Sequence, residues 1–138
     1  MKDELITAKY VGLSGPTDDG QELECRDVTI KTEHAEMVGA VGDAFLMDDV
    51  EVSMPRVGLL IAACWLYDAD NKGKGYGKEL YRKALRKYGV LYSGWPVSED
   101  AMFVHDALVR SGDVTITPFN QFGVRTLTAT RKHEAARY

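Results

Sequence analysis

Several features are scarce or missing in this sequence of 138 residues, and each absence excludes a class of protein. The two cysteines, Cys25 and Cys64, lie far apart, so we expect reduced thiols rather than a disulfide framework. The three histidines, His34, His105 and His133, show no clustered ligand spacing, which argues against a metal site. No apolar segment opens the chain and the longest apolar run has eleven residues, so the sequence predicts neither a signal peptide nor a membrane-spanning helix.

Internal repeats and low-complexity segments are also absent. A chain of this length fits one domain, residues 1–138, and can bury about two-thirds of its unfolded surface without disulfides. Together with the reduced cysteines and the missing signal peptide, this composition predicts a cytoplasmic protein.

Charge is distributed unevenly, although the net charge is only −4. Residues 1–70 hold five Lys or Arg against fifteen Asp or Glu, whereas residues 71–138 hold twelve against six. Seven of those twelve cations fall between Lys72 and Lys87, which favours an anionic ligand there. A solvated helix face explains the helix cations equally well. The acidic half either keeps the protein soluble, the simpler interpretation, or attracts a cationic amine.

The most informative segment interleaves glycine with lysine and reads Lys72-Gly73-Lys74-Gly75-Tyr76-Gly77. Glycines permit tight turns and close approach of the backbone to an anion. A helix that starts here adds unpaired N–H groups and the positive end of its dipole. The segment therefore predicts a loop that binds a phosphate or diphosphate.

The flanking segments place this loop between a strand and a helix. Residues 57–67 are apolar without alternation, as is typical of a strand buried on both faces. Apolar residues then recur at helical spacing from Tyr76 to Tyr88, and Gly89 follows where a helix would stop. The predicted order is strand, glycine loop, helix.

Two widespread phosphate-binding motifs do not fit this spacing. A Walker loop requires Gly-x-x-x-x-Gly-Lys followed by Ser or Thr, but Gly77-Lys78 is followed by Glu79, and position 72 is lysine. A dinucleotide fingerprint requires Gly-x-Gly-x-x-Gly, whereas these glycines stand at 73, 75 and 77, without an acidic residue ending a strand about 20 positions later. Both interpretations fail.

The stretch from Tyr67 to Leu85 instead resembles the acetyl-CoA site of the GNAT N-acetyltransferase superfamily. The family motif is Arg/Gln-x-x-Gly-x-Gly/Ala after the fourth strand, and here it reads Lys72-x-x-Gly75-x-Gly77. Lysine keeps a cation beside the diphosphate but lacks the planar fork of arginine. The resemblance implies an α+β fold with a mixed, mostly antiparallel sheet that splays at the cofactor site and carries helices on both faces.

The resemblance covers roughly residues 50–130. Residues 90–92 predict a short strand, Ser98 predicts the N-cap of a helix that ends at Gly112, and two segments, 113–119 and 124–130, predict a closing hairpin. More loosely, Leu91-Tyr92-Ser93 followed by Ser98-Glu99-Asp100-Ala101 is similar to short GNAT-like proteins encoded by bacteriophages.

The helix after Ser98 bears on catalysis. In GNAT proteins it often reads Asn-x-x-Ala-x-x-Leu-Tyr, and that tyrosine is the general acid for the departing thiolate. Aligning Ala101 with the alanine puts His105 at the tyrosine. His105 is therefore a candidate acid, because an unperturbed histidine has a pKa near 6.5, although a packed core residue is the simpler alternative.

Ser93 is the second candidate acid, with a turn-forming role as its alternative. No carboxylate stands out as general base. Asp68 and Asp70 are explained equally well as loop residues that end the strand, and Glu51 needs a strand register that the sequence does not define.

The resemblance implies an acyl-CoA-dependent N-acyltransferase that moves an acetyl group from acetyl-CoA to an amine by direct attack. The strand end at Leu66 and Tyr67 would offer backbone groups to the pantetheine arm. The implied cofactor-binding residues are Leu66, Tyr67, Lys72, Gly73, Lys74, Gly75, Tyr76 and Gly77. The acceptor, a small amine or a protein lysine or N-terminus, is not indicated, and a homodimer is left open.

Two other function classes remain as alternatives. One is a GNAT-like module without catalysis, because the family tyrosine is replaced. The other is a protein that binds or modifies nucleic acid through the basic helix. Against the latter stand the sequence pI of about 5.4 and the lack of an aromatic and basic platform.

The first fifty residues give weaker signals. Residues 7–13 and 22–32 predict strands joined by a turn at 15–20. Ala35 to Met47 fits either a helix or a strand interrupted by glycine, and residues 50–54 alternate as in a strand. This part is shorter than the two-helix acceptor region of the resembled family, so the acceptor does not follow from it.

Overall fold

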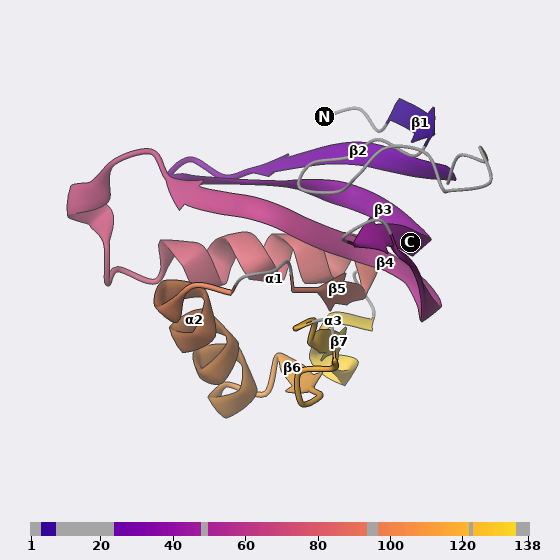
Figure 1. Ribbon diagram of the computed structural model, residues 1–138. Coiled ribbons are helices and arrows are strands. Elements are labelled where there is room, and N and C mark those ends of the chain that lie inside the picture. The colour runs from indigo at the N-terminus through magenta and orange to yellow at the C-terminus, as the bar shows by residue number, and fades with distance from the viewer. Residues whose placement is uncertain (1–3, 8–23, 48–49, 94–96, 122, 135–138) are drawn as a thin grey trace.

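The computed structural model describes residues 4–7, 24–47, 50–93, 97–121 and 123–134, which form an α+β fold (Figure 1). The strands are β1 (Glu4–Thr7), β2 (Glu24–Lys31), β3 (Ala35–Met47), β4 (Val50–Leu66), β5 (Val90–Tyr92), β6 (Val114–Ile116) and β7 (Thr126–Ala129). The helices are the 3₁₀ turn η1 (Ala69–Asn71), α1 (Tyr76–Tyr88), α2 (Glu99–Arg110) and α3 (Arg131–Glu134).

These strands form one sheet in the order β1-β2-β3-β4-β5-β7-β6. Only β4 and β5 pair in parallel, because α1 carries the chain back across the sheet between them. All other neighbours are antiparallel. The predicted mixed, mostly antiparallel sheet is therefore confirmed.

The long central hairpin resolves two uncertain segments. Ala35–Met47 is a strand rather than a helix, and the segments expected separately at 50–54 and 57–67 belong to one strand, β4. The middle of β4 is buried on both faces as predicted, at Leu59, Leu60 and Ile61. Its carboxyl end is not, since Trp65 is 43 % exposed.

A β-bulge separates the buried middle of β4 from its more exposed carboxyl end. Val38 pairs with Ala63 but Gly39 pairs with Ile61, so Ala62 is the extra residue. Gly39 lies against this bulge, and a Cβ added there would stand 2.2 Å from the carbonyl oxygen of Leu60. Position 39 of β3 thus requires glycine, because the backbones of β3 and β4 approach each other closely there.

Substituting Gly39 with alanine is expected to lower the free energy of unfolding by about 1–3 kcal/mol, because the new methyl group overlaps a backbone atom that cannot rotate away. Gly73→Ala is the control, since its Cβ meets open space and only the positive φ opposes it. Urea denaturation measures both. Equal stabilities for Gly39→Ala and the parent would contradict the bulge geometry.

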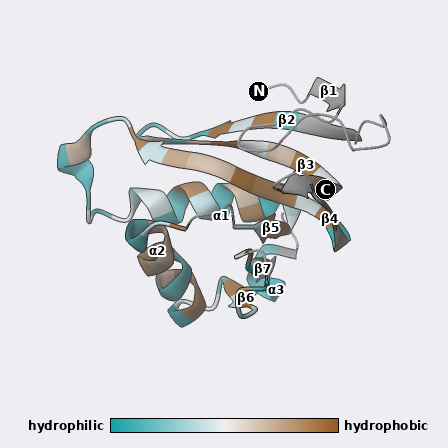
Figure 2. Cartoon of the chain, in the orientation of Figure 1, coloured by the Kyte–Doolittle hydropathy of each residue, from teal (hydrophilic) through white to brown (hydrophobic). Residues whose placement is uncertain are grey.

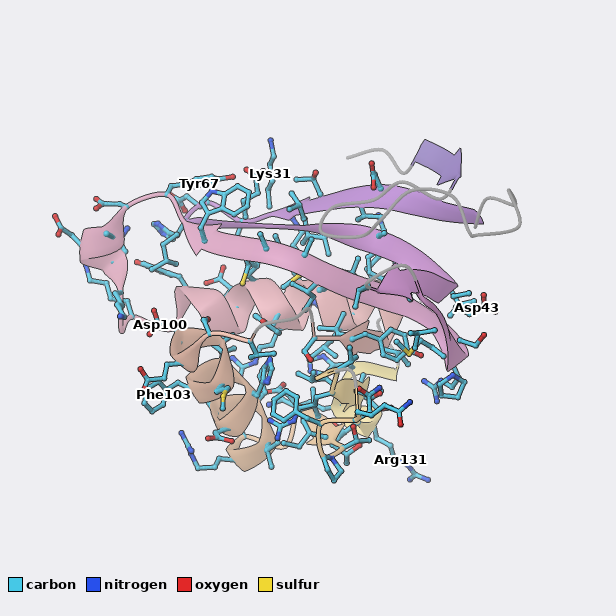
Figure 3. All side chains as sticks on the ribbon, in the orientation of Figure 1. Lys31, Asp43, Tyr67, Asp100, Phe103 and Arg131 are labelled. Carbon is cyan, nitrogen blue, oxygen red and sulfur yellow. The ribbon has the colours of Figure 1, made fainter. Side chains whose placement is uncertain are left out.

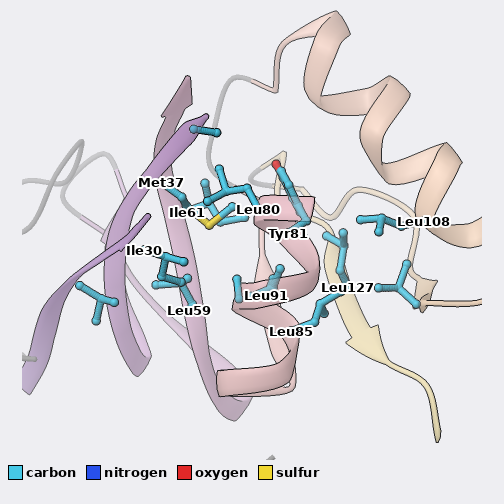
Figure 4. Close-up of a cluster of buried hydrophobic side chains, with 14 of the residues drawn as sticks. Ile30, Met37, Leu59, Ile61, Leu80, Tyr81, Leu85, Leu91, Leu108 and Leu127 are labelled. Carbon is cyan, nitrogen blue, oxygen red and sulfur yellow. The ribbon is translucent and has the colours of Figure 1, made fainter. Parts of the chain in front are cut away.

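One hydrophobic core joins the helices to the sheet (Figure 4). Helix α1 buries Leu80, Tyr81, Ala84 and Leu85 against Leu59 and Ile61 of β4, with Leu91, Leu108 and Leu127 beside them. Figure 2 shows the corresponding change along the chain, from the apolar middle of β4 to the hydrophilic turn at η1.

The described helices lie on one face of the sheet, which corrects the expectation of helices on both faces. Helix α1 contacts strands β2 to β5 and β7 and also contacts α2 and α3. A second cluster, which includes Leu60, Phe45 and Tyr92, lies on the opposite face, and no described helix contributes to it. In this chain β1 leads to β2 without a described helix, whereas the resembled family has two helices there.

The remaining elements differ in extent from the sequence expectations. β1 covers Glu4–Thr7, and the expected strand and turn between residues 8 and 20 lie outside the described residues. The closing hairpin is shorter than expected, and the short helix α3 after it was not predicted. Among the described residues, no helix is long and apolar enough to cross a membrane.

Candidate functional site

The sheet opens between β4 and β5. These strands pair only at Leu59 with Leu91 and at Leu60 with Tyr92. β4 then continues through the bulge to Leu66, whereas β5 ends at Tyr92. Within the described residues, no strand pairs with this edge of β4 beyond Leu60. We call this unpaired edge of β4, together with the helix α1 that contacts β4, the opening.

The two strand-end residues predicted to bind a cofactor, Leu66 and Tyr67, direct their backbone N–H groups to opposite sides of β4. The N–H of Tyr67 donates to the carbonyl oxygen of His34 at 3.0 Å, toward β3. Since backbone N–H groups alternate in direction along a strand, the N–H of Leu66 points to the open edge. The N–H of Tyr67 is therefore used within the sheet, whereas the N–H of Leu66 is not directed toward β3.

The glycine loop joins β4 to α1 and places the start of α1 as predicted. Asp68 caps η1 by accepting a hydrogen bond from the N–H of Asp70 at 2.9 Å. Gly75 is the N-cap of α1, with φ at 83°, and offers no side chain to the helix. The first helical hydrogen bond runs from Glu79 to Gly75, so the N–H groups of the first turn are available to an anion.

The three glycines of the loop have different reasons to be glycine. Gly73 and Gly75 have positive φ, and a Cβ on either would meet open space. Gly77 is already helical, and its Cβ would lie 3.3 Å from Cγ2 of Val104 in α2. Gly77 therefore allows α2 to approach α1, and its role beside a diphosphate stays a prediction.

The loop lysines are both exposed and both have partners. Lys72 forms an ion pair with Asp100 at 3.2 Å, across to the first turn of α2 (Figure 3 labels Asp100). Lys74 donates to the side chain of Asn71 at 3.2 Å. Tyr76 stacks on His34, with ring centroids 3.7 Å apart. The loop is thus tied to α2 and to the turn between β2 and β3.

His105 of α2 lies inside the protein, next to α1. Its exposed fraction is 1 %, and neither ring nitrogen has a hydrogen-bond partner among the described residues. Its ring meets that of Tyr81 edge to face at 5.7 Å. Burying a donor and an acceptor without partners is unfavourable by about 1–3 kcal/mol each, so this imidazole is suited to a ligand or a buried water.

His105 was chosen as a candidate acid because an unperturbed histidine has a pKa near 6.5, but the pKa in the structure is lower. Burial, and to a lesser extent the charge of Arg125, lower this pKa from 6.5 to about 4, against a smaller opposing effect of Asp106. His105 is therefore neutral at pH 7, with one N–H donor and one acceptor. It is able to donate a hydrogen bond but carries no surplus proton for a departing thiolate.

Ser93 follows β5 and is buried. Its N–H donates to the carbonyl oxygen of Arg125 at 2.9 Å, and its Oγ accepts from the N–H of Arg125 at 2.8 Å. Ser93 thus extends the pairing of β5 toward the β7 side. Arg125 interacts with both candidate acids. Its backbone is hydrogen-bonded to Ser93, and the charge of its guanidinium lowers the pKa of His105.

Two residues missed by sequence reasoning complete the opening. Cys64, on the helix-facing side of β4, has its Sγ 3.9 Å from the hydroxyl of Tyr81. Burial raises the pKa of the Cys64 thiol and raises that of Tyr81 well above 10. The helical spacing of Tyr81 indicated a core residue, which it is, but nothing in the sequence indicated that its hydroxyl points to β4.

The structure brings the loop and His105 close to each other without adding a general base. Gly77 touches the turn of α2 that carries His105, and Lys72 reaches the start of the same helix. Asp68 caps η1, and the side chain of Glu51 lies outside the described residues. Among the described residues, no group of three His, Cys, Asp or Glu side chains could hold a metal ion.

Comparison of the chain with protein-family models, with curated proteins and with solved structures gives no match. The geometry of the described residues therefore carries the functional argument.

Proposed function

We propose that this protein is an acyl-CoA-dependent N-acyltransferase of the GNAT type, transferring acetyl from acetyl-CoA to an amine. One observation supports it most: the unpaired edge of β4 leads to the start of α1, and its Cys64 lies 3.9 Å from Tyr81 of α1, whose ring meets the buried His105. Neither nitrogen of His105 has a hydrogen-bond partner among the described residues. An anion site, a strand edge and a buried donor on neighbouring elements suit a ligand with a diphosphate, an amide-bearing arm and a carbonyl at its end.

Each part of the opening has a task in this proposal. The first-turn N–H groups of α1 and the nearby lysines would hold the diphosphate. The N–H of Leu66 would pair with an amide of the pantetheine arm as a neighbouring strand does. The neutral imidazole of His105 would donate a hydrogen bond to the end of the arm, where the thioester lies.

Acetyl-CoA supplies the acetyl group as a thioester, whose carbonyl carbon forms a C–N bond with the amine as the C–S bond breaks. The nitrogen must lose a proton and the thiolate gain one. Burial holds the pKa of Tyr81 well above 10, so its hydroxyl stays protonated at pH 7. We assign it no role beyond the contact with Cys64.

The basic face of α1 supports this function better than nucleic-acid binding. Arg82 is bound to Asp113 at 2.9 Å, and Lys83 donates to the carbonyl oxygen of Lys31. These cations serve the fold rather than a phosphate backbone. A loop of two lysines and three glycines at one helix start fits a single diphosphate better than a long polyanion.

Thermal unfolding with acetyl-CoA, CoA and duplex DNA tests the assignment. Acetyl-CoA at a hundred times its dissociation constant is expected to stabilise the fold by about 2.7 kcal/mol and to raise Tm, with a smaller or equal effect of CoA and none of DNA. A Tm that stays constant with both thioester and thiol would contradict the proposal. Binding without acetyl transfer to any amine would support the non-catalytic alternative.

Gly75→Val is expected to weaken acetyl-CoA binding at least tenfold, because a β-branched residue is strongly disfavoured at φ 83° and displaces the start of α1. Gly73→Val is the matched control. It carries the same strain at φ 86°, but it lies outside the helix and leaves the first-turn amides in place. Isothermal titration measures both affinities. Equal losses for the two variants would show that strain, not the amides, sets the affinity.

A further inference from the structure

Two aromatic side chains are exposed at the carboxyl end of β4, on the face of the sheet away from the helices. Trp65 is 43 % and Tyr67 is 51 % exposed. Leu66, between them, packs against the helix-side core, so strand alternation places Trp65 and Tyr67 together on the other face. Figure 3 shows Tyr67 on that side, near Lys31.

A carboxylate accompanies the two rings. Glu36 of β3 is the cross-strand partner of Trp65, and its Oε1 accepts a hydrogen bond from the Tyr67 hydroxyl at 2.7 Å. This bond holds the Glu36 carboxylate beside the rings. Among the described residues, no ion pair to Glu36 is formed. Its second oxygen is therefore available to a ligand.

The other charges around this patch come from β2 and the turn after it. Lys31 is the cross-strand partner of Glu36 on the opposite side from Trp65, and it is exposed. Glu33 is fully turned to solvent, with its side chain 86 % exposed and 3.8 Å from His34. A cation bound at Glu36 thus meets one competing ammonium, that of Lys31, on a flexible stem.

We propose that Trp65, Tyr67 and Glu36 form a binding site for a primary alkylammonium group. Aromatic faces attract cations through the ring quadrupole, and a fixed carboxylate adds a charge-assisted hydrogen bond. The site lies at the end of β4 whose open edge would hold the thioester. Its role as the acceptor site rests on the proposed function, but its affinity for ammonium does not.

The experiment uses the fluorescence of Trp65 in the full chain carrying Trp95→Phe, which leaves one tryptophan. Butylammonium represents a free amine and a short lysine peptide represents a protein acceptor, with 1-pentanol as the neutral probe. Saturable quenching by the two ammonium probes, and none by the alcohol, is expected. The tighter of the two probes identifies the source of the amine. Quenching by the alcohol alone or by no probe would overturn the proposal.

Charge variants locate the site. Glu36→Gln is expected to weaken ammonium binding about tenfold, the loss expected when a charge-assisted contact of roughly 1.4 kcal/mol disappears. Glu33→Gln changes the net charge equally but lies in the turn, so it should leave affinity within about twofold. Lys31→Ala should tighten binding by removing the competing ammonium. Equal effects of the two glutamine variants would overturn the site.

Acetyl-CoA binding, measured on the same variants by thermal unfolding, separates the two proposals. Ammonium binding at Glu36 without any acetyl-CoA binding would leave this site standing and reject the acyltransferase. Acetyl transfer with an unchanged KM for the amine in Glu36→Gln would support the acyltransferase and reject this site as its acceptor site.

Discussion

Asp113→Ala is expected to lower the free energy of unfolding by about 3–5 kcal/mol, the usual loss when one partner of a buried ion pair is removed. Asp113 follows α2 and is fully buried. Its carboxylate accepts hydrogen bonds from Arg82 of α1 at 2.9 Å, from Ser111 at 2.6 Å and from His133 of α3 at 2.8 Å. Lys132 adds an ion pair at 3.3 Å.

One carboxylate therefore joins all three α-helices described in the structure. Without it, the buried His133 and the half-buried Arg82 would lose their partner. Asp106→Ala, an exposed position on α2, is the control and should change stability by less than about 0.5 kcal/mol. Urea denaturation with an unchanged m-value measures the difference. A loss at Asp113 no larger than the control would contradict a buried ion-pair network.

The same network predicts how stability depends on acid. Burial alone would raise the pKa of Asp113, but the hydrogen bonds from Arg82, Ser111 and His133 and the charge of Arg82 hold it well below its ordinary value. A carboxyl whose pKa is depressed by folding stabilises the protein above its unfolded pKa, about 3.9, and this stabilisation is lost as the pH falls below that value. The acid limb of the stability curve should therefore begin near pH 4 and weaken in Asp113→Ala.

His105→Phe is expected to lower acetyl transfer by roughly 10²–10³-fold, as loss of one preorganised donor does, while the free energy of unfolding at pH 7 rises by about 1 kcal/mol or more. The rise follows because phenylalanine has no buried nitrogen without a partner and still meets Tyr81 edge to face. His34→Phe is the control, since it preserves stacking on Tyr76 outside the opening. A drop in stability with unchanged turnover would identify His105 as a packing residue.

A second measurement on this variant tests the burial directly. Because the folded pKa of His105, about 4, lies below its unfolded value, the unfolded state takes up a proton first as the pH falls. Stability should decrease by about 2 kcal/mol between pH 7 and 4.5 in the parent and stay nearly constant over that range in His105→Phe. Parallel curves would mean that this imidazole titrates normally.

Local signals predicted the helices around the loop well. Apolar spacing together with Gly89 predicted the extent of α1, and Ser98 is the N-cap of α2, accepting a hydrogen bond from the N–H of Ala101. Both features depend on residues within one turn of each other. The short strand β5 was also predicted, because three apolar residues follow directly after the helix stop.

Features that depend on contacts between distant residues were not predicted. The segment of β3 was left ambiguous between a helix and a strand interrupted by glycine, because the carbonyl of Leu60 that requires Gly39 is supplied by another strand. The role of Gly77 depends on Val104 in the same way. His105 was chosen as a candidate from the family resemblance. Its low pKa results from burial and from the charge of Arg125, and the apolar periodicity of the sequence reveals neither of these.

The central claim, that one acyl-CoA molecule lies across the start of α1 and along the open edge of β4, is tested most directly by titrating acetyl-CoA into isotopically labelled protein and following amide chemical shifts. The proposal predicts saturable shifts at Tyr76, Gly77 and Lys78 of α1 and at Leu66 of β4, with the same dissociation constant. Amides of β2, such as that of Val28, should stay in place. Saturable shifts at only one of these two places, or at neither, would contradict it.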